Sequence, residues 1–341
     1  MNNPVTLGQV GIGYWGKNLL RNFAALPDAH VAMVCDQSAD VRSGVERQYP
    51  DVRATERFED LLESEAIQGV VIATETPQHY AMAKAALRAG KHVFVEKQMA
   101  QTAAEAEELV ALAEEQDVRL MVGHLLLYHP AFRHVEDLIQ EGALGDVHYL
   151  YSTRVNLGII RQRENALESL APHDIAVALH FLDQQPVAVS AQGQAYLQED
   201  IEDVAFATIF FDGGALVHLH TSWLDPHKIR KVTVVGSKQM AVIDDVEGTE
   251  KVRLYDKGVS PQPGEPRYAE YADAMKIRVG DIHIPRIPSQ EPLRLECQHF
   301  IDCIQSGEAP RSDGRDGLAV VRILEAAQRS LRQRGACVDL A

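Results

Sequence analysis

The chain has little cysteine and no long apolar run. Its 341 residues include four cysteines, which are scattered without the spacing of a metal site: Cys35, Cys297, Cys303 and Cys337. We therefore expect reduced thiols, with no disulfide and no bound metal. Apolar runs such as 70–73 and 125–127 are far shorter than the roughly 20 residues that a membrane span needs. The sequence thus predicts a globular chain without a membrane segment.

Positive charge is also scarce. Lysine and arginine number 33 against 49 aspartates and glutamates, so the formal net charge is −16. This argues against nucleic acid as a partner, because binding to a phosphate backbone needs a basic surface. It does not exclude a small anionic ligand, since helix N-terminal amides can hold a phosphate. Residues 1–6 lack the basic stretch and apolar core of a signal peptide, so we expect a cytoplasmic protein.

The first third of the chain has the rhythm of a parallel α/β domain. Short β-branched apolar runs alternate with longer amphipathic stretches, which is typical of βαβ units. The runs predict strands over 6–11, 30–36, 69–73, 92–96 and 118–123. The stretches predict helices over 15–25, 58–64, 78–89 and 103–115. Thr102 and Asp40 are expected helix caps, and Gly90 is an expected helix stop.

This alternation of predicted strands and helices ends after residue 124, which indicates one domain over 1–124 and a second over 125–341. The second part predicts helices over 130–141, 172–182, 292–305 and 315–332. Its strands are expected over 147–155, 187–195, 204–211, 215–223, 231–235 and 240–245. Most of these strands should form an antiparallel meander with Asp212-Gly213-Gly214 as a hairpin turn, and 258–290 should be a long loop. We therefore predict a C-terminal α+β domain built on a large, mostly antiparallel open sheet.

A glycine-rich turn follows the first predicted strand. Gly11-Ile12-Gly13-Tyr14-Trp15-Gly16 opens a predicted helix, and Asp36 ends the next strand, as in a Rossmann dinucleotide-binding domain. The glycines permit a tight turn, a close approach to the pyrophosphate and close packing of helix on strand. A carboxylate at Asp36 suits a ribose 2′-hydroxyl, so NAD is expected, while the nearby Arg42 leaves NADP open. A glycine-rich turn without a nucleotide is the other interpretation.

Lys97 comes directly after the fourth predicted strand. In open parallel sheets ligands bind beyond the carboxyl ends of the strands, so Lys97 should project towards the nicotinamide. A lysine that is partly desolvated there could polarise a substrate hydroxyl or relay its proton. A solvated lysine after a strand is the alternative.

Several motifs resemble the glucose–fructose oxidoreductase/inositol dehydrogenase/MocA family over nearly the whole chain. They are the glycine-rich turn continued by Lys17-Asn18, Ala73-Thr74-Glu75-Thr76-Pro77 with His79, Glu96-Lys97 and Val122-Gly123-His124. The resemblance implies that Lys97 and His173 flank the reacting carbinol. It also implies that Thr74, Pro77 and His79 lie on the nicotinamide side of the cofactor site, that Ala73 is a further cofactor contact, and that Glu96 belongs to a Glu-Lys cofactor motif.

Three further motifs resemble the branch of this family that acts on nucleotide-linked sugars: Asn156-Leu157-Gly158, Glu164-Asn165-Ala166-Leu167 and Ala171-Pro172-His173-Asp174. That branch includes UDP-N-acetylglucosamine and UDP-N-acetylglucosaminuronate 3-dehydrogenases of bacterial surface-polysaccharide pathways. The resemblance implies hydride transfer from sugar C3 to NAD. Two residues depart from the family pattern. Gln98 replaces the usual proline, and Ser169 replaces an aspartate that many members have four residues before the histidine.

His173 lies just inside a predicted helix start, after Pro172. Histidine titrates near neutral pH and suits a general base, although a helix-start histidine bound by the backbone is the alternative. The polar segment before His173 is our candidate for binding the diphosphate or the sugar, because arginine forks suit phosphate oxygens. The candidate substrate contacts, each with a solvated residue as the alternative, are Tyr151, Arg154, Asn156, Arg161, Arg163, Ser169 and Asp174.

Two other functions stay open at this point. The first is an enzyme of the same fold that acts on a free sugar, inositol or another polyol. The second is a dinucleotide-binding regulatory protein without turnover, which Gln98 and Ser169 keep open and the Lys97/His173 pair argues against. Open antiparallel sheets often pair between subunits, so by analogy we expect a homodimer or homotetramer.

Overall fold

The computed structural model describes residues 4–261 and 275–340, and these divide into two compact units. The first unit is formed by the chain up to His129 together with Gln290–Glu325, and the second by Pro130–Ser289 together with the chain from Ala326 onward. The expected boundary after residue 124 missed the return of the C-terminal segment to the first unit, where a late helix packs on the first helix and first strand. Over the described ranges, no helix is both long and apolar enough to span a lipid bilayer.

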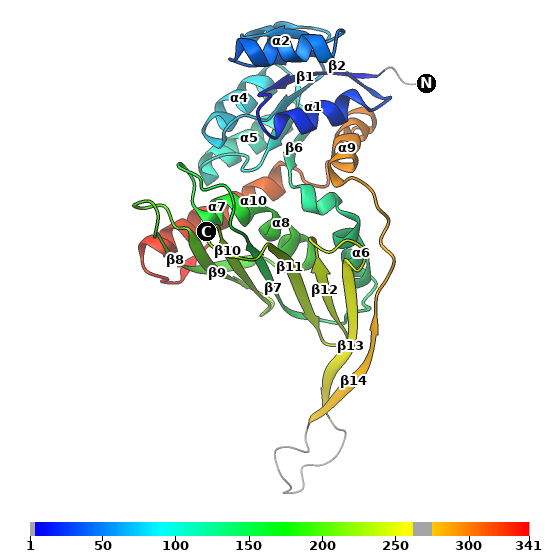
Figure 1. Ribbon diagram of the computed structural model, residues 1–341, viewed down its shortest axis with the longest axis vertical. Helices are drawn as coiled ribbons and strands as arrows, with labels where there is room; N and C mark the ends of the chain where they lie inside the picture. The colour runs from blue at the N-terminus through cyan, green and yellow to red at the C-terminus, as the bar shows by residue number, and fades with distance from the viewer. Residues whose placement is uncertain (1–3, 262–274, 341) are drawn as a thin grey trace, which may run out of the picture. The chain divides into compact units, whose positions relative to one another are not determined.

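The first unit is built on a six-stranded parallel sheet (Figure 1). Its strands are β1 (Val5–Val10), β2 (Ala29–Cys35), β3 (Arg53–Thr55), β4 (Gly69–Ile72), β5 (His92–Glu96) and β6 (Leu120–Gly123). Their order is β3-β2-β1-β4-β5-β6, so the sheet is extended from β1 first on one side and then, starting with β4, on the other. Ligands of doubly wound sheets bind at that point, beyond the carboxyl ends of the strands. The predicted parallel α/β domain is confirmed, and β3 is the strand that the sequence did not reveal.

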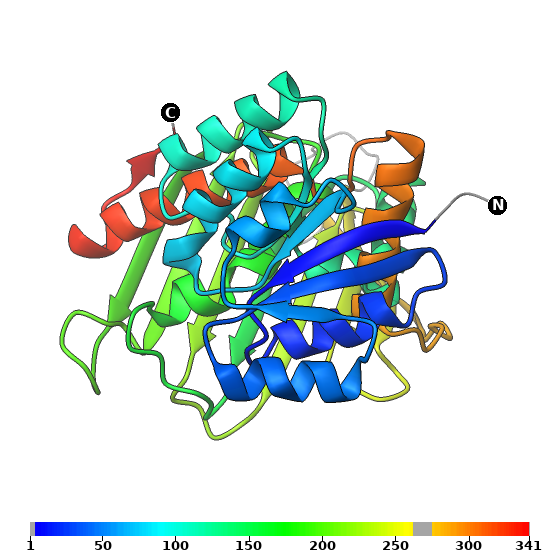
Figure 2. The same cartoon turned by 90° about the horizontal axis from the view of Figure 1, so that it is seen from above.

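Helices cover both faces of this sheet, as Figure 2 shows for α1 and α2 on one side and α4 and α5 on the other. The helices of the first unit are α1 (Gly16–Ala24), α2 (Ala39–Gln48), α3 (Glu59–Glu63), α4 (Thr76–Arg88), α5 (Ala103–Glu115), the 3-10 helix η1 (Leu125–Tyr128), α9 (Pro292–Ser306) and the first part of α10 (Gly314–Arg332). Phe23 of α1, Phe94 of β5 and Phe300 of α9 pack edge to face, with ring centroids 5.8–6.3 Å apart. This aromatic cluster fixes α9 against β5.

The helix ends test three sequence predictions. Thr102 caps α5 in a reciprocal capping box with Glu105, as predicted. Gly90, with a φ of 70°, follows the end of α4, also as predicted. The prediction for Asp40 was wrong, because the Ser38 hydroxyl accepts the hydrogen bond from the N–H of Val41 and Asp40 lies within the first turn of α2.

The second unit is built on a nine-stranded sheet with helices on one face (Figure 1). Its strands are β7 (Val147–Val155), β8 (Pro186–Gln194), β9 (Val204–Phe211), β10 (Leu216–Ser222), β11 (Ile229–Gly236), β12 (Met240–Asp244), β13 (Val252–Pro261), β14 (Met275–His283) and β15 (Val338–Asp339). Its helices are α6 (Pro130–Gln140), α7 (Ala166–Leu170), α8 (Pro172–Phe181) and the end of α10. The mostly antiparallel open sheet is confirmed, with the order β14-β13-β12-β11-β7-β10-β9-β8-β15.

Two details of this sheet correct the sequence analysis. The predicted meander is interrupted, because β7 inserts between β10 and β11 and pairs with β10 in parallel. The long loop predicted over 258–290 is wrong for much of the described part, since β13 and β14 continue the sheet as an antiparallel pair. The apolar residues Ile277 and Val279 alternate with polar ones there, as in a strand. Residues 262–274 of that prediction lie outside the described residues.

The two faces of the sheet differ along β7. Leu150, Ser152 and Arg154 are buried beneath the helices, whereas Tyr149 and Tyr151 between them are 40% and 41% exposed on the opposite, open face. The buried Arg154 forms a two-pronged ion pair with Asp174 of α8, with Nε 2.6 Å from Oδ2 and Nη2 2.9 Å from Oδ1. This ion pair attaches the first turn of α8 to β7.

We expect Arg154→Met to lower the free energy of unfolding by about 3–5 kcal/mol, because the Asp174 carboxylate is then buried without its cation. The double variant Arg154→Met/Asp174→Leu should recover most of the loss, since it removes both charges. Urea unfolding followed by circular dichroism measures both effects. Arg230→Met is the control, because Arg230 is half-exposed and lies 3.7 Å from Asp245. A double variant that is no more stable than Arg154→Met would contradict this account.

Candidate functional site

The glycine-rich turn between β1 and α1 leaves no room for side chains at its two ends. A Cβ on Gly11, which has a φ of +85°, would lie 2.7 Å from the carbonyl oxygen of Ala73. A Cβ on Gly16 would lie 2.1 Å from the carbonyl oxygen of Gly11. Beside Gly13, in contrast, the space within 4 Å of such a Cβ is open. The turn therefore has the shape of a cradle for a pyrophosphate at the start of α1.

Gln9 holds this turn in place, and the sequence analysis did not single it out. The buried amide of Gln9 donates hydrogen bonds to the carbonyl oxygens of Gly16 (2.8 Å) and Gly11 (3.3 Å). A polar side chain in an otherwise apolar buried strand was the signal that could have revealed it.

The carboxylate of Asp36 lies at the end of β2 next to the turn. It accepts hydrogen bonds from the backbone N–H of Ile12 (2.8 Å) and from that of Ser38 (2.9 Å). Asp36 is half-buried, and each of its oxygens has a second lone pair for a ligand. The residue can therefore hold a ribose diol while it ties β2 to the glycine-rich turn.

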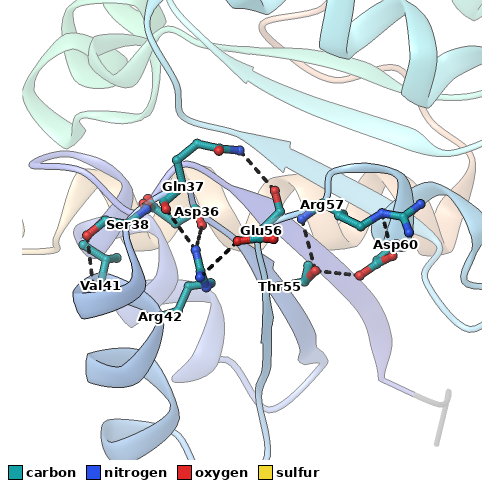
Figure 3. A network of polar contacts seen from close by, with 9 residues as sticks. All are labelled: Asp36, Gln37, Ser38, Val41, Arg42, Thr55, Glu56, Arg57 and Asp60. Atoms are coloured by element: carbon teal, nitrogen blue, oxygen red, sulfur yellow. Dashed lines mark hydrogen bonds and ion pairs between the residues drawn. The ribbon is translucent and has the colours of Figure 1, made fainter.

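Arg42 reaches back from α2 to the same strand end (Figure 3). Its Nη1 donates to the backbone carbonyls of Asp36 (2.8 Å) and Gln37 (3.0 Å), and its Nη2 lies 3.3 Å from Glu56. The guanidinium is therefore occupied by the loop that follows β2.

Glu96 joins the glycine-rich turn to Lys97. Its Oε1 accepts a hydrogen bond from the indole N–H of Trp15 (2.6 Å), and its Oε2 accepts one from the backbone N–H of Lys97 (3.3 Å). Burial raises the pKa of the Glu96 carboxyl to about 7, although Lys97 and Trp15 favour its charged form. Glu96 is buried, so it positions the two segments rather than facing solvent. Lys97 itself is half-buried at the carboxyl end of β5.

His79 has a positioning role that corrects the prediction of a ligand contact. Its side chain is 0% exposed, and its ring nitrogens lie 2.6 Å from the carbonyl oxygen of Gln98 and 3.1 Å from that of Thr74. Burial lowers the pKa of His79, so the ring is neutral at physiological pH and donates to one carbonyl at a time. The ring therefore links the loop after β4 to the segment after Lys97. Tyr14 and Pro77, in contrast, are exposed, and Ala73 and Thr74 are half-buried.

In the second unit, His173 lies in the first turn of α8 and is half-buried. Its neighbour Asp174 and the predicted substrate contact Arg154 are bound to each other, so their charged groups are not available for a substrate. Tyr151 lies on the open face of the sheet, opposite α8, and is corrected as well. The sequence analysis grouped Tyr151 with Arg154 without applying the two-residue period of a strand.

The remaining candidates lie between β7 and α8. Asn156 is half-buried and Ser169 is buried, whereas Arg161 and Arg163 are exposed. The side chain of Gln198 donates to the carbonyl oxygen of Arg161 (2.7 Å), which ties this loop to the chain after β8. These residues belong to the second unit and Lys97 to the first, so the meeting of Lys97 and His173 stays a prediction.

Asn165 is a structural residue at this loop whose role the sequence analysis missed. It caps α7 in a reciprocal box with Glu168, and its amide donates to Glu202 (2.8 Å). An asparagine followed three residues later by a glutamate was the available signal.

Comparison with known proteins agrees with this architecture. A model of an oxidoreductase family with an NAD-binding Rossmann fold matches residues 5–124, and a model of the C-terminal domain of the same family, GFO/IDH/MocA, matches residues 132–242. The UDP-N-acetylglucosamine 3-dehydrogenase of Acidithiobacillus ferrooxidans is 27% identical over 94% of each chain. The myo-inositol 2-dehydrogenase of Thermotoga maritima is 24% identical over 96% of each chain.

Solved structures share the fold over the full length. A structure of the same Acidithiobacillus ferrooxidans enzyme has a TM-score of 0.81 at 24% identity, covering 98% of this chain and 99% of that one. An aldose-aldose oxidoreductase from Caulobacter crescentus has a TM-score of 0.83 at 21% identity, covering 99% of this chain and 100% of that one. Since the two family models together match more than half of the chain, this protein belongs to the GFO/IDH/MocA family of NAD-binding oxidoreductases.

Proposed function

We propose that the protein is an NAD-dependent dehydrogenase that oxidises C3 of a UDP-N-acetylhexosamine, or of its uronate, during synthesis of nucleotide sugars for surface polysaccharides. The observation that carries the proposal is the double role of Glu96, which accepts hydrogen bonds both from Trp15 of the glycine-rich turn and from the backbone of Lys97. A lysine held in this way beside a dinucleotide cradle suits the oxidation of an alcohol. NAD and nucleotide sugars are cytoplasmic metabolites, so we propose a cytoplasmic location.

The substrate class is supported by two observations. A UDP-N-acetylglucosamine 3-dehydrogenase is among the relatives that match along most of their length. The exposed Arg161 and Arg163 in the loop after β7 suit the oxygens of a diphosphate. Inositol dehydrogenases are also among the relatives, which keeps a free polyol as the second candidate substrate.

The proposed mechanism divides the work between the cofactor and the side chains. NAD, when bound, supplies the acceptor for the hydride that leaves the carbinol carbon. Lys97 holds the substrate hydroxyl by a hydrogen bond, and His173 accepts its proton as general base. The glycine-rich turn and Asp36 fit the pyrophosphate and the adenosine ribose of this cofactor. The protein thus contributes orientation and proton transfer.

We expect Lys97→Ala to lower kcat by about 10²–10³-fold, the usual cost of removing one hydrogen-bond donor to the reacting oxygen. The measurement is the absorbance of reduced cofactor with a panel of nucleotide sugars, free sugars and inositols. Lys84→Met is the control, because Lys84 is a half-buried lysine of α4 that pairs with Glu108. Turnover of a free sugar or inositol with none of any nucleotide sugar would show that the proposed substrate class is wrong.

NAD is the proposed cofactor because the Asp36 carboxylate repels a 2′-phosphate and Arg42 is engaged by backbone carbonyls. We expect Asp36→Asn to raise the Kd of NADH by about tenfold or more, since a hydrogen bond to a charged group contributes roughly 1.5–3 kcal/mol. The ratio of NADPH to NADH affinity should rise with it. Fluorescence titration with both cofactors measures the change. Glu56→Gln, which alters only the exposed partner of Arg42, should leave the ratio unchanged, and an equal change in both variants would count against the role of Asp36.

We also propose that two copies of the chain associate through the open face of the nine-stranded sheet. Tyr149 pairs with Leu216 and Leu216 with Phe210 across neighbouring strands, so these exposed side chains form one apolar row on that face. The same row on a second copy would cover it symmetrically.

We expect Tyr149→Glu/Phe210→Glu to give a monomer, because two buried carboxylates in the paired faces would be costly. Sedimentation equilibrium of the wild type and the variant tests this. Tyr196→Glu is the control, since Tyr196 is an exposed aromatic residue (69%) in the loop after β8, outside the strands of the sheet. A wild-type monomer at micromolar concentration would contradict the proposal.

A further inference from the structure

Glu296 in α9 is a buried carboxyl group that the proposed mechanism does not use. It is 1% exposed, and neither of its carboxyl oxygens has a hydrogen-bond partner among the described residues. An ionised carboxylate is costly in such a place. Burial raises the pKa of Glu296 well above its ordinary value, and the nearby Glu96 raises it further. Glu296 therefore keeps its proton to a higher pH than an ordinary glutamate does.

Packing of α9 on β5 brings Glu296 opposite Glu96. Phe94 of β5 and Phe300 of α9 are in contact, with ring centroids 5.8 Å apart. Glu96 lies two residues after Phe94, on the same side of the strand, at about 6.7 Å along it. Glu296 lies four residues before Phe300, on the same side of the helix, at about 6 Å along it. Ile304, further along α9, lies beside Gly69, which pairs with His92 at the start of β5, so α9 runs antiparallel to β5. The two nearly equal steps therefore lead in the same direction and place the two carboxyl groups on facing sides of β5 and α9, in agreement with their mutual repulsion.

The other groups around the two glutamates favour charge on Glu96 alone. Trp15 of α1 and the backbone of Lys97 both donate to Glu96, and the ammonium of Lys97 also favours its charged form. Gly123 of β6, the residue before His124, packs closely against the Glu96 carboxyl group, since a Cβ on Gly123 would lie 3.0 Å from it.

Two ionisable groups beside Glu296, Tyr128 and Cys297, are not cations. Tyr128 of η1 is close enough to feel its charge, but the Tyr128 hydroxyl pairs with Ser312 (2.9 Å). Cys297, the next residue in α9, is buried, and the charges of both glutamates raise the pKa of its thiol beyond the effect of burial. None of these neighbours supplies a cation to Glu296.

We propose that Glu96 and Glu296 form a buried carboxyl pair in which Glu296 holds the proton and Glu96 carries the charge, and that Glu296 is a positioning residue that acts through Glu96. The pair has three charge states. With two protons Glu96 is a weak acceptor for Trp15, and with none the two carboxylates repel each other. The state with one proton therefore best joins the glycine-rich turn to Lys97. The positioning role, but not the pair itself, rests on the proposed function.

Trp15 can report the charge states of the pair without cofactor or substrate. The chain has two tryptophans, so Trp223→Phe leaves Trp15 as the single indole emitter. In Trp223→Phe we expect two steps in the emission with pH, one near the Glu96 pKa of about 7 and a second, from Glu296, at higher pH. Adding Glu296→Gln should remove the upper step and keep the lower one. Adding Glu96→Gln should abolish the lower step. A titration that Glu296→Gln does not change would overturn the proposal.

A second measurement avoids the Trp223→Phe background. Infrared difference spectra of wild type against Glu296→Gln at pH 8, above the lower step, should show the carbonyl stretch of one protonated carboxylic acid in the wild type. Glu308→Gln, at an exposed glutamate just after α9, should show none. A carboxylate band in place of the acid band would mean that Glu296 is ionised, which would also overturn the proposal.

The positioning role predicts a bell-shaped dependence of NADH affinity on pH. Below the lower step and above the upper one, the Kd of wild type should rise by up to about tenfold per pH unit. Glu296→Gln should keep the acid limb and lose the alkaline limb, whereas Glu308→Gln should keep both. This binding readout needs no sugar substrate, so failure to oxidise any nucleotide sugar would not affect it. An alkaline limb that persists in Glu296→Gln would refute the positioning role.

The dependence of stability on pH shows whether the variant is folded. It also tests whether Glu296 is protonated in the folded protein. The pKa of Glu296 is raised by folding, so the stability that its proton contributes is complete below its ordinary value of 4.5 and is lost as the pH rises through the folded value. Glu296→Gln cannot lose a proton and escapes this loss. Its urea midpoint should therefore rise relative to wild type from pH 5 to pH 8. A constant difference over that range would contradict a protonated Glu296.

Discussion

The hydrogen bond from the indole of Trp15 to the carboxyl group of Glu96 connects the two parts of the first unit on which its chemistry depends. Trp15 stands where the glycine-rich turn becomes α1, and Glu96 ends the strand that carries Lys97. The bond is short and part-buried, and the same carboxyl group also accepts a hydrogen bond from the backbone N–H of Lys97. The glycine-rich turn and the candidate catalytic lysine are thus joined by hydrogen bonds within a single unit.

Buried polar groups perform this kind of positioning repeatedly. His79 links two loops beyond β4 and β5, Gln9 holds the glycine-rich turn, and the Arg154–Asp174 ion pair attaches α8 to β7. Each of these groups has at least two polar contacts within hydrogen-bond distance, which offset much of the cost of burying it. Glu296 stands apart, because burial with no hydrogen bond costs stability and points to a role other than structure.

Local signals in the sequence predicted much of the first unit and of its site. The apolar run of β5, the capping box of Thr102 and the glycine pattern before α1 are each encoded within a few neighbouring residues. Pairings between distant segments were not readable in this way. The insertion of β7 beside β10 and the burial of Arg154 against Asp174 depend on residues that the chain brings together only when folded. Tyr151 shows that one strand offers different residues to its two faces, which a list of polar residues does not reveal.

The return of α9 to the first unit also constrains how that unit folds. Phe300 completes an aromatic cluster with Phe23 and Phe94, so residues near the two ends of the chain share one core. Contacts between residues so far apart in sequence form late, because a long loop must close before they are made. During synthesis on the ribosome, the parallel sheet therefore emerges before α9, which covers part of one face. The apolar surface on that face is buried only after α9 has been made.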